Sequence, residues 1–153
     1  MTSEKLVSVI INTYNDADVL KNAVLSALNQ TWEHLELIVY DNASSDNTLE
    51  ILAGVKDERM RTILASRHTN LSTARNIALD CSLGDYVCFL DSDDTWAPEK
   101  LALQIQAIEE NDLEFCFTNF HFSDSGHVNE PTYKGKSLNT SFHKIPFEIG
   151  YPA

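Results

Sequence analysis

The chain alternates short apolar runs with stretches in which apolar residues recur at helical spacing. Continuous apolar runs of about four to eight residues, rich in β-branched side chains, predict buried strands. The strand candidates are Leu6–Ile11, Leu35–Tyr40, Met60–Ser66 with Ile63 and Leu64 at its centre, Tyr86–Leu90 and Phe115–Phe122. The segments between them show the spacing of amphipathic helices. This alternation predicts an α/β fold with a mostly parallel sheet and helices on both faces.

Helix and turn signals flank these elements. Asp16 or Asp18 can cap the helix that follows the first strand. Gly84 marks the end of the helix that begins near Ser72. Pro98 suits the first turn of a further helix.

The regular pattern fades towards the carboxyl end of the sequence. We expect residues 1–122 to form one α/β domain, and residues 123–153 to form a partial further segment or a tail. Ser123–Gly126 is expected to be a turn. The fold is therefore expected to be incomplete at its C-terminus.

Composition narrows the classes of partner. The formal net charge is −12, which argues against nucleic acid and anionic membrane as main partners because both are bound by Lys and Arg. No apolar run approaches the roughly 18 residues of a transmembrane helix. The three cysteines lie in apolar contexts, which is typical of free thiols in a reducing cytoplasm.

Polar residues stand at or soon after the ends of four strands. The carboxyl ends of parallel strands meet at one edge of a sheet, where α/β folds bind ligands, so we expect these residues to line one cleft. The candidate site residues are, in chain order, Thr13, Tyr14, Asn15, Asp41, Arg75, Asp91, Ser92 and Asp93.

Asp91 and Asp93 form an Asp-x-Asp pair at the end of a buried strand. Two carboxylates so close together repel each other unless a cation lies between them. A hard divalent cation held there can bind a diphosphate. For Asp94 and Thr95 we favour a capping role at the next helix.

Each of the other candidates has a structural alternative. Asp41 can simply cap the Ser45–Thr48 region. Arg75 can be a surface residue paired with an acid. His68 lies near the expected cleft, which chance explains better than function.

Several segments, in order along the chain, carry a resemblance to a known family. They are Thr13–Asn15, Ser26–Gln30, Asp41–Thr48, Ala74–Asn76 and Gly84–Asp94. Together they resemble the family 2 glycosyltransferases, which have the Rossmann-like GT-A fold. Trp96–Leu101 is also similar to the bacterial lipopolysaccharide and capsule branch of that family.

The resemblance implies an activity. A sugar is transferred with inversion from a UDP-sugar-type donor to a glycan or lipid-linked acceptor, in cell-surface polysaccharide synthesis. It implies Mn²⁺ or Mg²⁺ as cofactor. It also implies a cytoplasmic location, with peripheral contact at the inner membrane face in the full-length protein.

The resemblance also implies a role for individual residues. Thr13 and Tyr14 would border the base, and Asp41 would accept a hydrogen bond from its imide N–H. Arg75 would lie beside the base and the phosphate. Asp91 would face the ribose and the metal shell, and Asp93 would ligate the metal.

The sequence departs from the family pattern at two places. Asn70 stands where the family often has Gly in a loop that needs positive φ, which Asn tolerates. The general base of inverting members follows the metal motif at a distance, and neither Glu130 nor Glu148 lies in a recognisable acid motif. We therefore expect the base to be missing from these 153 residues, which leaves weak donor binding and little turnover.

Three other classes remain open at this point. A haloacid-dehalogenase-type phosphatase would use Asp91 as nucleophile and Asp93 as acid. A truncated, non-catalytic nucleotide-sugar-binding module would keep the cleft and the metal. A dinucleotide-binding oxidoreductase is disfavoured because no Gly-x-Gly-x-x-Gly follows the first strand.

Overall fold

The computed structural model describes residues 5–118, 123–124 and 127–128. Contacts between residues group the chain into two units, Met1–Ala102 and Leu103–Ala153. The first unit holds, in order, β1 (Val7–Thr13), α1 (Leu20–Leu28), β2 (Leu35–Asp41), α2 (Thr48–Ala53), β3 (Met60–Leu64), α3 (Leu71–Asp80) and β4 (Tyr86–Asp91). Helix α4 (Lys100–Asn111) crosses the boundary between the units. In the second unit, β5 (Ser123–Asp124) and β6 (His127–Val128) pair antiparallel.

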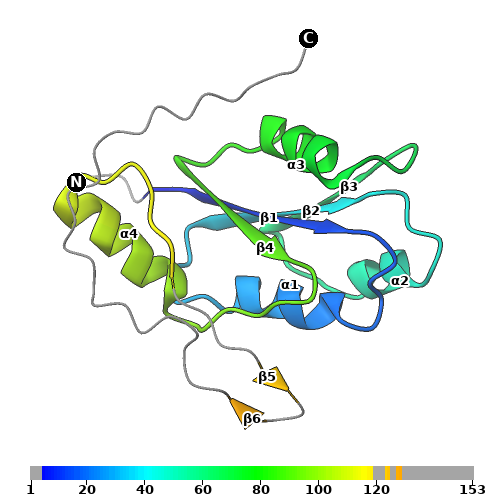
Figure 1. Cartoon of the computed structure of the whole chain (residues 1–153), viewed down its shortest axis with the longest axis horizontal. Coiled ribbons are helices and arrows are strands. Elements are labelled where there is room, and N and C mark those ends of the chain that lie inside the picture. The colour runs from blue at the N-terminus through cyan, green and yellow to red at the C-terminus, as the bar shows by residue number, and fades with distance from the viewer. Residues whose placement is uncertain (1–4, 119–122, 125–126, 129–153) are drawn as a thin grey trace. The chain divides into compact units, whose positions relative to one another are not determined.

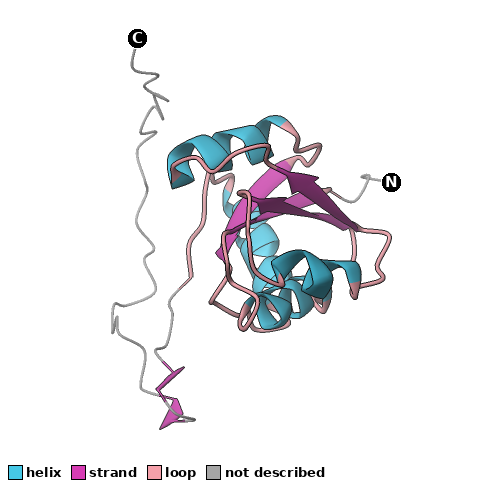
Figure 2. Ribbon diagram, turned by 90° about the vertical axis from the view of Figure 1, so that its right-hand side faces the viewer, coloured by secondary structure: helices cyan, strands magenta, loops and turns pink. Residues whose placement is uncertain are grey.

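The four strands of the first unit form one parallel sheet in the order β3-β2-β1-β4. Helix α3 covers one face, and α1 and α2 cover the other (Figure 1). Figure 2 shows the same layering from the side. The expected α/β fold with helices on both faces is confirmed. Because all strands run in the same direction, their carboxyl ends form one edge of the sheet.

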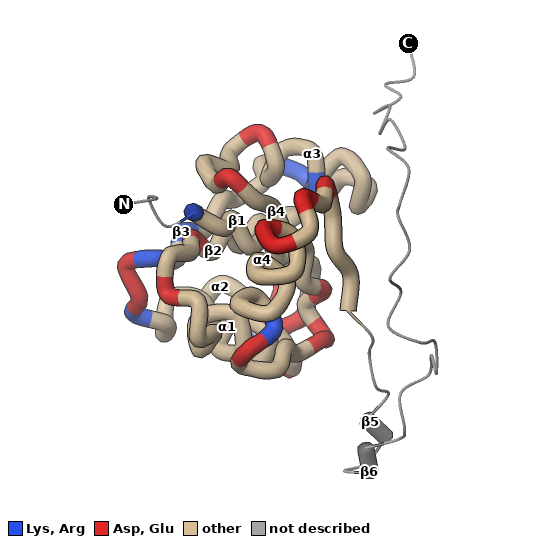
Figure 3. Tube along the Cα trace, turned by 90° about the vertical axis from the view of Figure 1, so that its left-hand side faces the viewer, with Lys and Arg blue, Asp and Glu red and all other residues tan. Residues whose placement is uncertain are grey.

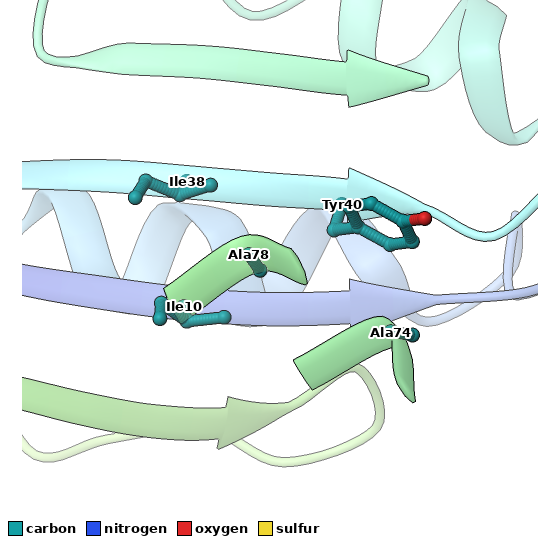
Figure 4. Packing of buried hydrophobic residues seen from close by; sticks show 5 residues of the cluster. All are labelled: Ile10, Ile38, Tyr40, Ala74 and Ala78. Carbon is teal, nitrogen blue, oxygen red and sulfur yellow. The ribbon is translucent and has the colours of Figure 1, made fainter. Parts of the chain in front are cut away.

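Small side chains of α3 bring that helix close to the sheet. Ala74 and Ala78 are fully buried and belong to one cluster with Ile10, Ile38 and Tyr40 (Figure 4). The other face is covered by the apolar stripe of α1, all of it buried: Leu20, Ala23, Val24, Ala27 and Leu28. This packing fixes the strands whose ends carry the candidate site.

A polar network closes the amino edge of the same sheet. Glu36 accepts hydrogen bonds from the Ser8 hydroxyl (2.6 Å) and the Leu83 amide (2.6 Å). Its other oxygen pairs with Arg61 (3.1 Å). The Ser8 hydroxyl in turn accepts from the Gly84 amide (2.8 Å). Every strand or its leading loop is tied into this network.

Several sequence predictions about element ends were wrong. Residues 115–118 of the expected fifth strand have no regular structure, and residues 119–122 lie outside the described part. Helix α3 ends at Asp80, before Gly84. Gly84 instead packs against the Ser8 backbone, where a Cβ would come within 2.6 Å. Pro98 lies in the turn before α4 rather than inside the helix.

The expected helix caps were also different. No side chain caps α1, whose N-cap is Val19, because the Asp16 carboxylate is bound to Thr13 and Tyr14 instead. Asn70 has φ −68°, and its side chain accepts from the Thr73 amide as the N-cap of α3. The expected positive φ at Asn70 was therefore wrong. Asn at this position caps helix α3.

No helix among the described residues is both long and apolar enough to span a bilayer.

Candidate functional site

A cleft of about 440 Å³ lies at the carboxyl edge of the sheet. Five of the eight predicted site residues line it: Thr13, Tyr14, Asp91, Ser92 and Asp93. The strand ends bring them together, since β1 lies between β2 and β4. Asn15, Asp41 and Arg75 lie outside the lining.

Asp16 organises the floor of this cleft. One of its carboxylate oxygens, Oδ2, accepts hydrogen bonds from the Thr13 hydroxyl (3.1 Å), the Tyr14 amide (3.1 Å) and the Ser92 hydroxyl (2.6 Å). It thereby joins the ends of β1 and β4. The sequence offered Asp16 only as a helix cap, because its partner Ser92 lies 76 residues away.

Asn15 links the loop after β1 to the loop after β2. Its amide donates to the Ser44 hydroxyl (2.9 Å), and its side-chain oxygen accepts from the Ser45 amide (2.7 Å). Asn15 has φ 58°, and Ala43 in the second loop has φ 65°. These left-handed conformations are unusual for residues other than glycine. Asn15 therefore shapes the rim of the cleft without lining it.

Asp41 is buried at the end of β2, with 2 % of its surface exposed. Its Oδ2 accepts from the Ser44 amide (3.1 Å), so it does hold the turn that follows the strand. The N-cap of α2, Asn47, makes no side-chain hydrogen bond, and the preceding Asp46 accepts from the Thr48 amide (3.0 Å). Hydrogen bonds from Thr48 lower the pKa of Asp46.

Arg75 forms an ion pair with Asp91 (2.5 Å). Its guanidinium also lies 5.5 Å from the centre of the Phe89 ring. Figure 3 shows this basic position of α3 beside the acidic stretch at the end of β4. Both side chains are substantially exposed. In this conformation Arg75 is therefore a surface residue paired with an acid, the structural alternative that the sequence left open.

Negative charge accumulates after β4. Partial burial raises the pKa of Asp94, and the charges of Asp93 and Asp91 raise it further. The Asp93 carboxylate is exposed in the cleft lining. Among the described residues, no three His, Cys, Asp or Glu side chains converge on a common point as a complete metal cage would require.

The loop between β3 and α3 forms another wall. Asn42 holds it with both ends of its carboxamide: the oxygen accepts from the Thr69 amide (3.0 Å) and the nitrogen donates to the Thr69 carbonyl (2.8 Å). His68 lies against Tyr14, with ring centres 4.0 Å apart. Both rings line the cleft. Asn42 was not among the predicted site residues, and the expected position of His68 near the cleft was attributed to chance.

Some polar atoms at this edge are buried without a hydrogen-bond partner among the residues that the structure describes. They are Oδ1 and Nδ2 of Asn12 and Oδ1 of Asp41. Buried polar groups are nearly always hydrogen-bonded, and exceptions are often found where a ligand binds.

The sequence belongs to a known family. The sequence model of "Glycosyl transferase family 2" matches residues 8–152, nearly the whole chain. The chain is therefore a member of glycosyltransferase family 2 and has the GT-A fold, as the motifs predicted.

Similar proteins include bacterial glycosyltransferases. The chain is 38 % identical to UDP-Glc:alpha-D-GlcNAc-diphosphoundecaprenol beta-1,3-glucosyltransferase WfaP of Escherichia coli, over 76 % of this chain and 47 % of the relative. It is 40 % identical to the putative teichuronic acid biosynthesis glycosyltransferase TuaG of Bacillus subtilis, over 78 % and 49 %. The chain thus spans about half the length of these relatives.

Solved structures show the same fold with donors bound. TarS of S. aureus in complex with UDP-GlcNAc has a TM-score of 0.66 and 28 % identity, over 69 % of this chain and 32 % of TarS. The mannosyltransferase PcManGT from Pyrobaculum calidifontis, in complex with GDP-Man and Mn²⁺, has a TM-score of 0.64 and 26 % identity, over 70 % and 33 %. The phosphatase, oxidoreductase and non-catalytic alternatives gain no support from these comparisons.

Proposed function

We propose that the cleft binds a UDP-sugar-type donor, and that the protein transfers its sugar with inversion to a glycan or lipid-linked acceptor in cell-surface polysaccharide synthesis. The observation that carries this proposal is the convergence of Thr13, Tyr14, Asp91, Ser92 and Asp93 on one cleft of a family 2 chain. The name of WfaP, a UDP-Glc-dependent glucosyltransferase that acts on a diphosphoundecaprenol-linked GlcNAc, supports the donor and the lipid-linked acceptor. TuaG, named for teichuronic acid biosynthesis, supports the pathway class.

Asp41 supports a uracil base over guanine. A carboxylate that recognises guanine commonly uses both oxygens, for the N1–H and the N2–H₂ donors. In Asp41 only Oδ1 lacks a partner, because Oδ2 accepts from the Ser44 amide. Asp41 lies outside the cleft lining but next to the lining residue Asn42, and its one vacant acceptor would match the single imide N–H of a uracil that reaches it. Thr13 and Tyr14 would border the base, with the Tyr14 ring already held against His68.

The donor set fits Mn²⁺ or Mg²⁺. Both ions prefer carboxylate oxygens and bind through one or two carboxylates plus substrate phosphates, so an incomplete protein cage is what such a site needs. Asp93 would be the main protein ligand, with Asp91 in the metal shell. When bound, the ion neutralises charge on the leaving diphosphate. The repulsion that raises the pKa of Asp94 would be relieved at the same time.

Arg75 would serve the phosphate side of the site. Its partner Asp91 holds the guanidinium at the cleft rim, and Arg binds phosphate oxygens in a bidentate manner. Ser92 stays fixed by Asp16, and Asn15 keeps the two rim loops together. The acceptor hydroxyl needs a general base within hydrogen-bond reach, and we assign that role to a carboxylate that is not among the residues lining this cleft.

Calorimetry with free nucleotides tests the proposal. The protein should bind UDP in Mn²⁺ and lose most of that affinity in EDTA, and GDP and CDP should bind about tenfold more weakly because their base edges mismatch one vacant acceptor. Asp41→Asn should reduce the preference for UDP, whereas the exposed Asp80→Asn should not. Absence of UDP binding, or a UDP affinity that is the same in Mn²⁺ and in EDTA, would overturn the proposal.

A further inference from the structure

Asn12 is the last residue but one of β1, and its carboxamide has no hydrogen-bond partner in the described part of the chain. Both Oδ1 and Nδ2 are buried from solvent, and neither makes a hydrogen bond. Asn42, by contrast, uses both ends of its carboxamide at the same edge. Burying an amide without hydrogen bonds opposes folding. A residue kept in this condition has a use that the protein alone does not show.

The position of Asn12 is fixed by the strand register. Asn12 lies opposite Asp91 of β4 and opposite Tyr40 of β2. Residues in register on parallel strands point to the same face of the sheet, and Ile10 and Tyr40 place this face under α3. Asn12 and Asp91 both line the cleft. A ligand group that reaches Asn12 therefore also meets Asp91.

The hydrogen-bonding capacity of Asn12 and Asp91 indicates which kind of ligand group can bind to both. Asp91 only accepts hydrogen bonds, and its Oδ1 already accepts from Arg75, which leaves Oδ2. The Asn12 carboxamide donates through Nδ2 and accepts through Oδ1. A carbonyl oxygen of a base has no proton to donate to Asp91, and a phosphate oxygen would meet a like charge. A hydroxyl both donates and accepts, so it satisfies the two residues together.

We propose that Asn12 is a specificity-determining residue that binds a ligand hydroxyl beside Asp91. The inference rests on the proposed function, in which a nucleotide sugar occupies the cleft. Such a donor carries hydroxyls on its ribose and on its transferred sugar. The bound hydroxyl supplies the hydrogen bonds that the carboxamide lacks in the free protein.

Two variants separate this role from a structural one. Asn12→Leu keeps the size of the side chain and removes its polar atoms, and Asn12→Ala is a second variant in case leucine does not fit. Without ligand, the melting temperature of either variant should be unchanged or raised, because a polar group without partners is removed. With UDP and Mn²⁺, the affinity should fall roughly three- to tenfold, the size of one lost hydrogen bond. The exposed Asn22→Ala in α1 is the matched control and should change neither quantity.

The source of the hydroxyl is identified with three ligands: UDP, 2′- and 3′-deoxy-UDP, and UDP-glucose. If the hydroxyl belongs to the ribose, one of the two deoxy analogues should bind the wild type as weakly as UDP binds the Asn12→Leu variant. The Asn12→Leu substitution should then cause no further loss of affinity for that analogue. If the hydroxyl belongs to the transferred sugar, the substitution should lower the affinity for UDP-glucose and leave the affinity for UDP unchanged.

The inference is overturned if wild type and both variants bind UDP and UDP-glucose equally well. It is also overturned if the variants melt lower while binding is unchanged, since the carboxamide is then structural. In either case UDP binding by the wild type still upholds the proposed function, whereas no UDP binding at all refutes the proposed function itself.

Discussion

The two edges of the sheet treat their polar residues in opposite ways. At the amino edge, Glu36, Ser8 and Arg61 form a network in which both carboxylate oxygens and the hydroxyl are hydrogen-bonded. At the carboxyl edge, polar atoms of Asn12 and Asp41 are buried and have no hydrogen-bond partner among the described residues. Strands β1 and β2 each carry residues of both sets.

This difference separates stability from binding. A satisfied buried network rigidifies the structure, whereas partly satisfied groups leave hydrogen-bonding capacity for something else. Backbone strain follows the same division, because Asn15 and Ala43 have positive φ next to the cleft. Changes at the amino edge should therefore affect folding, and changes at the carboxyl edge should affect ligand affinity.

The largest effect is expected from Gly84→Ala. A Cβ at Gly84 would come within 2.6 Å of the Ser8 amide nitrogen and 2.7 Å of the Tyr86 carbonyl oxygen. Both atoms belong to backbone that cannot move without disturbing β1 and β4, so we expect a loss of about 3 kcal/mol or more in the free energy of unfolding. Urea denaturation measures it.

Gly54→Ala is the matched control for that experiment. Gly54 has φ −76°, and its added Cβ would lie no closer than 3.3 Å to any neighbour. Its stability should stay within about 0.5 kcal/mol of wild type. A Gly84→Ala protein as stable as Gly54→Ala would show that the amino edge is more loosely packed than described.

Asp93→Asn should produce the next largest effect, on binding and not on folding. The exposed Asp93 carboxylate would be the main ligand of the divalent ion, so UDP affinity in Mn²⁺ should fall by about tenfold or more. The melting temperature of the free protein should not fall, because among the described residues the side chain has no ion pair or hydrogen bond to lose. Titration of Mn²⁺ with UDP present measures the change.

Asp18→Asn provides a charge-matched control for Asp93→Asn, since Asp18 is exposed and lies outside the cleft lining. If both variants bind UDP equally well, the loss does not come from a metal ligand, and the assignment of Asp93 is wrong.

Glu36→Gln tests the amino edge through pH. Burial raises the pKa of Glu36, but hydrogen bonds from Ser8 and Leu83 and the charge of Arg61 outweigh it and lower the pKa below the ordinary 4.5. A carboxyl with a lowered pKa stabilises the fold above its unfolded pKa, and that contribution is lost as the pH falls through the folded pKa. At neutral pH we expect Glu36→Gln to be about 1–2 kcal/mol less stable than wild type.

Below pH 4.5 the gap between Glu36→Gln and wild type should narrow, because protonation removes the same charge from the wild type. Thermal melting over a pH series measures the gap. The exposed Glu58→Gln should run parallel to wild type throughout. A gap that is constant with pH would mean that the Glu36 charge does not contribute.

The strands could be predicted well because they depend on local pattern. Leu35–Tyr40 and Tyr86–Leu90 each fall one residue short of β2 and β4. β2 is the buried parallel strand that a continuous apolar run predicts, whereas β4 lies at the sheet edge and only its Leu90 is buried. Caps were harder. The choice between Asp16 as a cap and Asp16 as a partner of Ser92 depends on β1 and β4 being neighbours, and sequence spacing does not contain that fact.

The candidate site was predicted in outline and missed in detail. Thr13, Asp91 and Asp93 follow from the rule that strand ends bind ligands, and all three line the cleft. Asn12 was missed because it looks like the last polar residue of a strand. Its importance comes from lacking partners, which only the three-dimensional packing reveals.

The smallest effect, and the one most specific to strain near the cleft, is expected from Ala43→Gly. Ala43 has φ 65°, a conformation that costs a residue with a Cβ about 1–2 kcal/mol. Glycine removes that cost but loses more entropy on folding, so the net gain in unfolding free energy should be about 0.5–1 kcal/mol. The same substitution inside a helix, Ala107→Gly in α4, should instead lose about 0.5–1 kcal/mol. Thermal melting distinguishes the two signs; if Ala43→Gly is destabilised like Ala107→Gly, strain is not stored in the loop after β2. A gain in stability together with weaker UDP binding would show that the strained turn at Asp41 and Ser44 is held for the ligand.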